Sequence, residues 1–594
     1  MNHFIFSENV AFFQKKDGEE IDAIITTLFD AIVALGEPIY KRVNPAITTI
    51  AGMKYSFIAF KRDKIPTFFE LGFDPGEPWH EKKLAYLLVI EYNGYVAIQK
   101  KDIADIKNLR KALTPIDYNI LCKVLDDKEI IYKRFGMNNL DISDKAMRSK
   151  ALEAEDLKPV FSTLGASNYE LTNYRITNKQ GAFSIGVDSS KINHLQTRVT
   201  FLDYLKWCKY IIDKIEKTSA KDVNNYLSIF ATPIDYKQEY DAGNLNARYL
   251  LISVYKLNDE KWIESIREEG TGAEVKLKEI CDLFSKSIKL EDTGGGKYSK
   301  VLAEGKKVEV TVRERGISFS CDWMKGIHLC GKEDDVILLD YILENGLFTV
   351  MFSSTKLKYT NRKLFKDNKL TGNIDLFLEL FEKDAKLVNT KGEKDYEGNK
   401  LVATDTQFPR KSLFAYIEKK YKKDGTIIVC DDLGTEWADH IRISENSVAL
   451  FAAKHKDLCF SASAFQEVVG QAQKNLGAFF PLNTMWKRKA TKWSGFYQLG
   501  GVDTHISRVR IPGRTAKEAI DCWKKAEKKG NYQRDLYIVI DFISKQVLED
   551  NLLKLKKGGD FAQKKETVPI LWLISSLWAS CQELNIRLHI TCRP

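Results

Sequence analysis

The sequence lacks the features of a secreted, fibrous or membrane-spanning protein. Its 10 cysteines form no Cys-x-x-Cys pair, which is typical of buried thiols in a reduced cytosolic protein. Glycine (35) and proline (13) are too few among 594 residues for a linker-dominated chain. The longest uncharged run, 567–582, is shorter than the ~20 residues that cross a bilayer, and the N-terminus does not resemble a signal peptide. We therefore expect a cytoplasmic protein without a membrane partner.

Nucleotide-binding and zinc-binding motifs are also missing. The run Thr293-Gly294-Gly295-Gly296-Lys297 is similar to part of a phosphate-binding loop. That loop needs a glycine and a Ser or Thr where this chain has Glu291 and Tyr298. The segment 321–330 holds cysteine, aspartate and histidine, but it lacks the second, paired half of a zinc site. We therefore expect a flexible turn at 293–297 and no nucleotide-binding motif.

The composition predicts a multidomain globular protein. Hydrophobic residues make up 44% and charged residues 29% of a chain long enough for several domains. Helical and alternating patterns are mixed throughout, which predicts α/β and α+β folds. The predicted domains are an N-terminal α+β domain without a trusted chemical motif (1–235), a middle α+β domain (236–405) and a C-terminal domain (406–594). The polar stretch 389–400 is interpreted as a linker.

Within the N-terminal domain, amphipathic patterns predict helices at 19–34 and 198–217. Two apolar runs, 84–92 and 95–100, flank Asn93-Gly94. Asn-Gly suits the positive φ angles of a tight turn, so these runs are predicted to form a β-hairpin.

The positive charge is confined to one part of the chain. The net charge is +10, and residues 401–594 carry 31 basic and 21 acidic residues, so the first 400 residues are neutral. Residues 471–534 alone carry 14 basic against 4 acidic residues. Such an asymmetry is typical of a polyanion partner, although a solvated lysine-rich face is the alternative reading.

The C-terminal domain begins with the order α-β-β-β-α. A helix is predicted at 411–423, strands at 425–430, 438–444 and 448–454, and a second helix at 463–477. Further along, a buried strand (534–542), two helices (543–557 and 568–583) and a last strand (586–592) are expected to extend the same sheet. Trp572 and Trp578 in the second of these helices are expected in the core.

The hairpin 438–454 predicts a juxtaposition of charges. With a turn centred on Asn446-Ser447, Asp439 lies opposite Lys454 on one apolar face. A carboxylate there can hold a divalent cation, and a lysine can orient water or offset charge during phosphodiester hydrolysis. A structural cross-strand ion pair is the competing interpretation. Glu436 can supply a second carboxylate, and Gln471 follows in the next helix.

The basic stretch interleaves aromatic and cationic residues, which can stack on bases and contact phosphates. Packing in the core is an equally good explanation for any single aromatic residue. The candidate nucleic-acid-binding residues are Lys474, Lys487, Arg488, Lys489, Lys492, Trp493, Arg508, Arg510 and Arg514.

Glu436-Trp437-Ala438-Asp439, Phe451-Ala452-Ala453-Lys454 and Gln471 together resemble the active-site signature of the PD-(D/E)xK nuclease superfamily, in its Mrr-like branch. The resemblance covers residues 410–480. It implies a restriction-endonuclease-like αβββα core with a mixed sheet. It also implies that Asp439, Glu436 and the main-chain carbonyl of Ala453 bind Mg²⁺ or Mn²⁺, that Lys454 is the catalytic lysine, and that Gln471 supports the site.

The chain departs from this family pattern at one position. The acid expected two residues before the lysine is replaced by Ala452, so Glu436, or Glu418 from the preceding helix, has to compensate. The resemblance implies a metal-dependent DNA endonuclease, of a kind found in bacterial anti-phage and restriction systems. Its partners would be DNA and, in addition, other defence proteins or further copies of the chain. The alternatives are a non-catalytic nucleic-acid-binding subunit with a degenerate nuclease fold and a protein-interaction scaffold.

Overall fold

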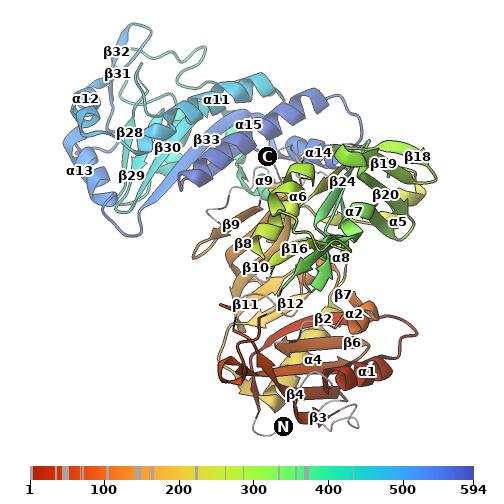
Figure 1. The fold of residues 1–594 in the computed structure, drawn as a ribbon. Helices are drawn as coiled ribbons and strands as arrows, with labels where there is room; N and C mark the ends of the chain where they lie inside the picture. Colours follow the sequence, from red (N-terminus) through yellow and green to blue (C-terminus); the bar gives the residue numbers. More distant parts are fainter. Residues whose placement is uncertain are drawn as a thin grey trace. The chain divides into compact units, whose positions relative to one another are not determined.

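Helices and strands mix along the chain, which forms several separate sheets (Figure 1). The computed structural model describes residues 4–33, 37–42, 52–66, 68–69, 73–101, 103, 106–140, 149–158, 161, 166–220, 225–260, 263–284, 286–331, 335–354, 357–366, 374–432 and 434–594. The chain divides into two units, Met1–Leu157 with Ser167–Asn368, and Lys158–Ala166 with Lys369–Pro594. The predicted boundary at 405/406 therefore falls inside the second unit, and the division at 235/236 stays a prediction. Across the described ranges, no helix is both long and apolar enough to cross a membrane.

The first unit contains an antiparallel sheet of eleven strands, in the order β3-β4-β5-β6-β2-β12-β11-β10-β8-β9 with β7 on β2. Its strands are β2 (Asn9–Lys15), β3 (Glu37–Arg42), β4 (Lys54–Lys64), β5 (Glu81–Tyr92), β6 (Tyr95–Lys101), β7 (Leu113–Pro115), β8 (Ile131–Asn139), β9 (Ser149–Glu153), β10 (Tyr169–Asn178), β11 (Gly181–Gly186) and β12 (Lys191–His194). The expected hairpin is β5–β6, and Asn93 and Gly94 both have positive φ. The expected helices are α1 (Ile21–Val33) and α4 (Phe201–Lys217).

Four smaller sheets complete the described part of the first unit. One is the antiparallel pair of β1 (Ile5–Phe6) and β13 (Val199–Thr200). The other three have six, four and three strands. Their strands are β14 (Pro233–Ile234), β15 (Ala247–Ile252), β17 (Ile288–Lys289), β24 (Phe348–Phe352), β25 (Leu357–Thr360) and β26 (Lys363–Lys366); β18 (Glu291–Gly294), β19 (Lys297–Val301), β20 (Lys307–Arg313) and β21 (Gly316–Cys321); and β16 (Ser265–Glu268), β22 (Ile327–Cys330) and β23 (Asp335–Ile337). The run 293–297 contains the turn between β18 and β19, where three consecutive glycines, Gly294 to Gly296, adopt positive φ.

The second unit is organised around a mixed six-stranded sheet in the order β27-β34-β33-β30-β29-β28. The strands are β27 (Phe381–Lys383), β28 (Ile427–Cys430), β29 (His440–Ile443), β30 (Ser447–Lys454), β33 (Gln533–Ser544) and β34 (Arg587–Arg593). The first three strands after α10 (Leu413–Tyr421), β28 to β30, pair antiparallel, whereas β33 pairs parallel with both β30 and β34. The predicted α-β-β-β-α order is confirmed and ends with α11 (Ala462–Asn475).

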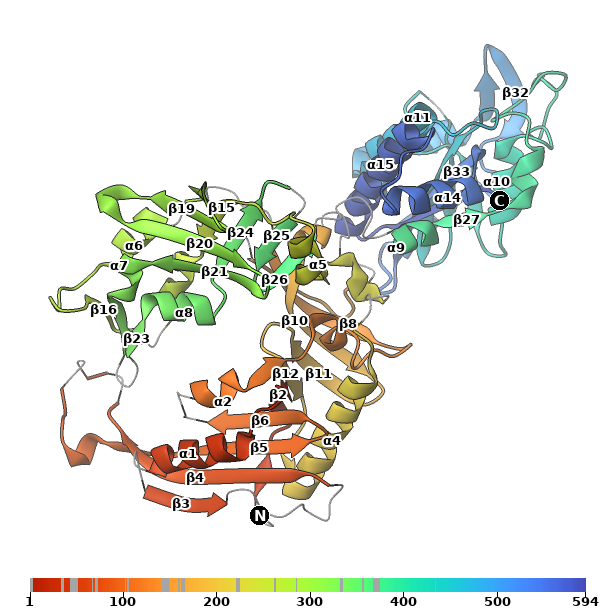
Figure 2. The ribbon, with the colours of Figure 1, turned by 90° about the vertical axis from the view of Figure 1, so that its right-hand side faces the viewer.

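Helices cover both faces of this sheet, because its strands are apolar on both sides. One core contains side chains of α11, α12 (Asn483–Trp493), α13 (Ala516–Ala526), α14 (Lys545–Lys556) and α15 (Lys564–Glu583). The other core lies under α10 and the hairpin β31–β32 (Phe496–Leu499 and Val502–Ser507). Figure 2 shows α10 and the pair α11 and α15 on opposite sides of β33.

The predicted register of the β29–β30 hairpin is wrong by two residues. His440 pairs with Phe451 and Ile443 pairs with Val448, because the turn residues are Glu445 and Asn446. The Ser444 N–H donates to the Ser447 carbonyl across this turn (2.9 Å). A shift of two residues keeps every side chain on its predicted face, so Asp439 and Lys454 still belong to the same face.

Two further expectations are corrected by packing. Trp572 is 53% exposed, because it points away from the core that α15 shares with the sheet. The polar segment 389–400 is not a linker between units. Its Lys391 N–H donates to the Lys411 carbonyl and its Gly392 carbonyl accepts from Leu413 N–H, both at 2.9 Å, which fixes it against the start of α10.

Candidate active site

A buried ion pair shapes the bend between β28 and β29. Asp431 is fully buried and accepts hydrogen bonds from Trp437 N–H (2.8 Å) and Trp493 Nε1–H (2.7 Å). It also pairs with the ammonium of Lys489. Burial raises the pKa of Asp431, and Lys489 opposes this rise. Asp431 follows β28 directly, and its bond to Trp437 holds the end of the bend close to the beginning. The chain therefore returns to the sheet at the start of β29.

The bend brings three carboxylates together. The ligand oxygens of Asp432, Glu436 and Asp439 all lie within 4.8 Å of one another, and this is the one such group found among the described residues. Gln471 of α11 donates its amide hydrogens to Glu436 Oε1 (3.2 Å) and Asp439 Oδ1 (3.3 Å). Carboxylate oxygens are the ligands that Mg²⁺ and Mn²⁺ prefer, so the donor set fits either ion.

Asp439 is the most buried of the three, with 3% of its surface exposed. Its Oδ2 accepts the Ala453 N–H at 2.6 Å. Burial raises the pKa of Asp439 well above its ordinary value, and the charges of Asp432 and Glu393 raise it further. The N–H and C=O of one residue point to the same side of an extended strand, so the Ala453 carbonyl belongs to the strand edge that faces Asp439.

Lys454 ends β30 beside the carboxylates, but its direct partner is a different acid. Its Nζ lies 2.9 Å from Glu467 Oε2 on α11. Lys456 binds the other oxygen of Glu467 at 2.9 Å, and these bonds lower the pKa of Glu467 to about 2. The bond to Glu467 raises the pKa of Lys454, and the nearby charges of Glu393 and Asp439 add to this effect.

The structure adds residues to this group that sequence reasoning missed. Lys394 Nζ lies 2.7 Å from Asp432 Oδ2, and the Tyr497 hydroxyl donates to the same oxygen at 2.6 Å. Glu393 lies close enough to influence Lys454 and Asp439, and burial raises its pKa. Glu393 and Lys394 belong to a polar segment without periodicity, so no local signal distinguishes them from linker residues.

Four members of the basic stretch have buried side chains that bind other residues of the unit. Lys489 and Trp493 hold Asp431, and Arg508 is 3% exposed and donates to the main-chain carbonyls of Cys430 (3.3 Å) and Asp432 (3.1 Å). Arg510 binds Glu418 with two hydrogen bonds, at 2.7 and 3.1 Å. Their buried positions leave them no surface for a polynucleotide, so the expected nucleic-acid contacts of these four are withdrawn.

The remaining cations of the stretch lie at the surface. Lys474, Lys487, Arg488 and Arg514 are exposed. Lys474 approaches Glu436 at 3.9 Å. Lys492 is half-buried and donates to the Thr435 hydroxyl at 3.0 Å, next to the carboxylates.

Glu418, the alternative second acid, is not part of the group. It lies under the opposite face of the sheet, where it contacts His440 Nε2 (3.1 Å) and Arg510. The carboxylates that lie next to Asp439 are instead Asp432 and Glu436 from the bend.

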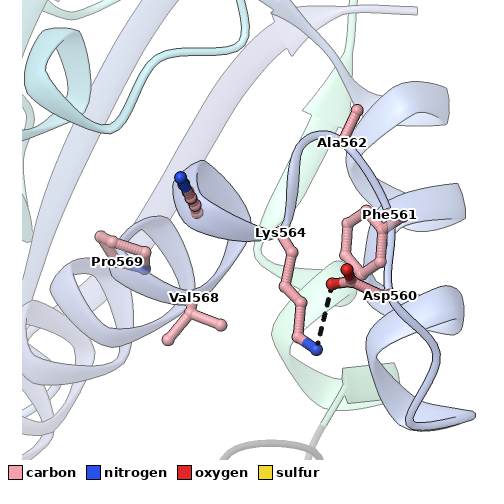
Figure 3. Close-up of a pocket in the computed structure, with 7 residues that line it drawn as sticks. Asp560, Phe561, Ala562, Lys564, Val568 and Pro569 are labelled. Atoms are coloured by element: carbon pink, nitrogen blue, oxygen red, sulfur yellow. Dashed lines mark hydrogen bonds and ion pairs between the residues drawn. The ribbon is translucent and has the colours of Figure 1, made fainter.

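A separate hollow is formed by the loop before α15 and the first turns of α15, and is lined by Phe561, Val568 and Pro569 together with charged side chains (Figure 3). Asp560 and Lys564 pair across it at 3.5 Å. It contains none of the clustered carboxylates.

No protein-family model matches this sequence, and no curated protein matches it.

Proposed function

We propose that the second unit is a metal-dependent deoxyribonuclease with a restriction-endonuclease-like core of the PD-(D/E)xK type. The observation that carries the proposal is the convergence of Asp432, Glu436 and Asp439 within 4.8 Å at the end of a β-hairpin whose last residue is Lys454. The strand order supports it, since three antiparallel strands are followed by a parallel one. The proposed role as an anti-phage or restriction effector rests on the family resemblance alone.

The carboxylates and the Ala453 carbonyl would hold one face of a Mg²⁺ or Mn²⁺ ion. Such an ion, when bound, polarises a phosphate and lowers the pKa of a water ligand. The protein's own residues supply the remaining functions. Gln471 keeps Glu436 and Asp439 side by side through its amide, and Lys454 offers an ammonium beside them that can orient water or offset the charge of the transferring phosphate.

Cations at the surface near the carboxylates would contact the DNA backbone. Lys474 and Lys492 lie next to Glu436 and Thr435 of the bend, and Lys487 and Arg488 extend the same positive surface along α12. Contacts of this kind give affinity that falls steeply with salt and carries no sequence preference.

The test is cleavage of supercoiled plasmid by the full chain with Mn²⁺ or Mg²⁺, with and without chelator. We expect metal-dependent nicking that falls about 10²–10³-fold in Lys454→Ala, the usual loss when one electrostatic contact to the reacting group is removed. Lys529→Ala is the matched control, because Lys529 pairs with Glu445 (2.9 Å) at the opposite end of the same hairpin. Its rate should equal that of the unmodified chain.

Two outcomes would replace this proposal. A salt-sensitive gel shift without cleavage in either metal would favour the non-catalytic DNA-binding subunit. A chain that neither binds nor cleaves DNA would favour the interaction scaffold. Cleavage that persists in Lys454→Ala would show that the nuclease activity lies elsewhere.

A further inference from the structure

The carboxylate group already holds one cation, the ammonium of Lys394. Its Nζ lies 2.7 Å from Asp432 Oδ2. The main chain just before Lys394 is fixed, because Gly392 C=O accepts from Leu413 N–H and Glu393 C=O accepts from Phe414 N–H (3.0 Å). The ammonium also lies 5.6 Å from the ring centroid of Phe414. Lys394 is therefore a built part of the site.

The ammonium of Lys394 leaves room for one ion beside Asp432. Tyr497 O–H and Lys394 both bind Asp432 Oδ2, and the Ala453 N–H binds Asp439 Oδ2 at 2.6 Å. A two-metal centre places its ions ~3.5–4 Å apart, so its carboxylates must have room for a positive charge on each of two sides. Here protein donors bind Oδ2 of Asp432 and both oxygens of Asp439, since Gln471 donates to Asp439 Oδ1 at 3.3 Å, and the positive charge beside Asp432 is that of Lys394.

We propose that the Lys394 ammonium occupies the position of a second divalent ion, so that the group of Asp432, Glu436 and Asp439 binds a single Mg²⁺ or Mn²⁺. This inference rests on the metal site of the proposed function. Lys394 acts as a positioning residue. It neutralises the outer side of Asp432 and keeps its carboxylate directed at one ion, while Lys454 offers its ammonium from the end of β30.

The test counts bound Mn²⁺ on the full chain without DNA, by calorimetry and by electron paramagnetic resonance of the free ion. The unmodified chain should bind one Mn²⁺ at this site. Lys394→Met retains the length of the aliphatic stem and removes the charge, so it should bind two. Its first Mn²⁺ should bind at least about tenfold more tightly, since a single and a double charge ~5 Å apart repel even at the dielectric constant of water.

Two variants separate charge from structure. Lys394→Arg retains the charge and should bind one Mn²⁺. Lys456→Met removes a lysine whose ammonium pairs with the outer acid Glu467 (2.9 Å), and this variant should also bind one Mn²⁺. Two ions on the unmodified chain would overturn the inference whether or not the Lys394 variants fold, and so would a single ion on folded Lys394→Met.

The inference and the proposed function fail in different ways. One bound Mn²⁺ without any DNA cleavage would remove the nuclease and leave the role of Lys394 intact. Cleavage by a chain that binds two Mn²⁺ would support the nuclease and overturn the role of Lys394. A chain that binds no Mn²⁺ would overturn both.

Discussion

Replacing Asp439 with asparagine should make the metal-free protein more stable while it abolishes metal binding. The side chains are nearly equal in size, so Asp439→Asn can still accept the Ala453 N–H. What changes is the charge, together with the weak bond from Gln471 to Oδ1 (3.3 Å). Asp439 is buried among two other carboxylates, and burial raises its pKa well above the ordinary value. A carboxyl group whose pKa is raised by folding destabilises the native state increasingly as the pH rises from the ordinary value to the raised one.

The size of the effect follows from the spacing of the charges. Two unit charges 4.8 Å apart repel by about 0.9 kcal/mol at the dielectric constant of water, and by more inside a protein. Neutralising Asp439 removes two such repulsions, about 1.7 kcal/mol, as well as the cost of burying its charge. The lost attraction to Lys394 offsets part of this gain. We expect a net stabilisation of about 1 kcal/mol, or ~2–4 °C in the melting temperature of a unit of this size.

The assay is thermal and urea unfolding at pH 8, in chelator and then in millimolar Mn²⁺. In chelator Asp439→Asn should melt above the unmodified chain. In Mn²⁺ the order should reverse, because an ion that binds only the native state stabilises the chain that retains its ligands. A variant that melts lower in chelator, or that still gains stability from Mn²⁺, would contradict this reasoning.

Asp535→Asn is the matched control for that experiment. Asp535 is buried in β33 of the same sheet, but Arg587 binds it with two hydrogen bonds, at 2.7 and 2.9 Å, and His589 adds a third. Burial raises the pKa of Asp535, yet these bonds outweigh burial and hold it below the ordinary value. Removing this charge should therefore destabilise the chain by about 1–3 kcal/mol, opposite in sign to Asp439→Asn.

Further predictions separate structural from DNA-contacting charges. Lys489→Ala leaves Asp431 charged and buried, so it should cost about 3–5 kcal/mol in urea unfolding. Lys487 is two residues away and exposed, so Lys487→Ala should leave stability unchanged. It should weaken DNA binding and lower the salt dependence of that binding by about one ion. Equal losses of stability in the two variants would contradict this assignment. Burial raises the pKa of Glu418, but His440 and Arg510 outweigh burial and hold it below 4.5. The stabilisation by charged Glu418 is present above pH 4.5 and is lost as the pH falls through its lowered pKa. Glu418→Gln should therefore cost about 2–3 kcal/mol at pH 7 and progressively less below pH 4.5. A series of urea titrations at different pH values measures this cost.

Elements with a strong local pattern were predictable. The Asn93-Gly94 hairpin, the α-β-β-β-α order and the long apolar strand β33 each follow from turn chemistry or periodicity within the element. The shared face of Asp439 and Lys454 was predictable for the same reason, because alternation along a strand survives a register error of two residues.

Charged residues with two equally good local explanations were not predictable. Lys487 and Lys489 are neighbours on α12 and equally basic, yet one is exposed and the other is buried on Asp431. Which one faces the core depends on where Asp431 lies, and Asp431 is 58 residues away from Lys489 in the chain. Local periodicity contains no information about such a partner.

Pattern along the chain was enough to place Asp439, Lys454 and Gln471 on neighbouring elements of one α/β core, because strand alternation and helix period depend only on nearby residues. The third carboxylate, Asp432, and the resident cation, Lys394, join them only after folding. They come from a bend and from a polar segment without period, and their positions are set by packing against Trp437, Tyr497 and the start of α10. Contacts between segments far apart in the chain thus decide which charges surround the site.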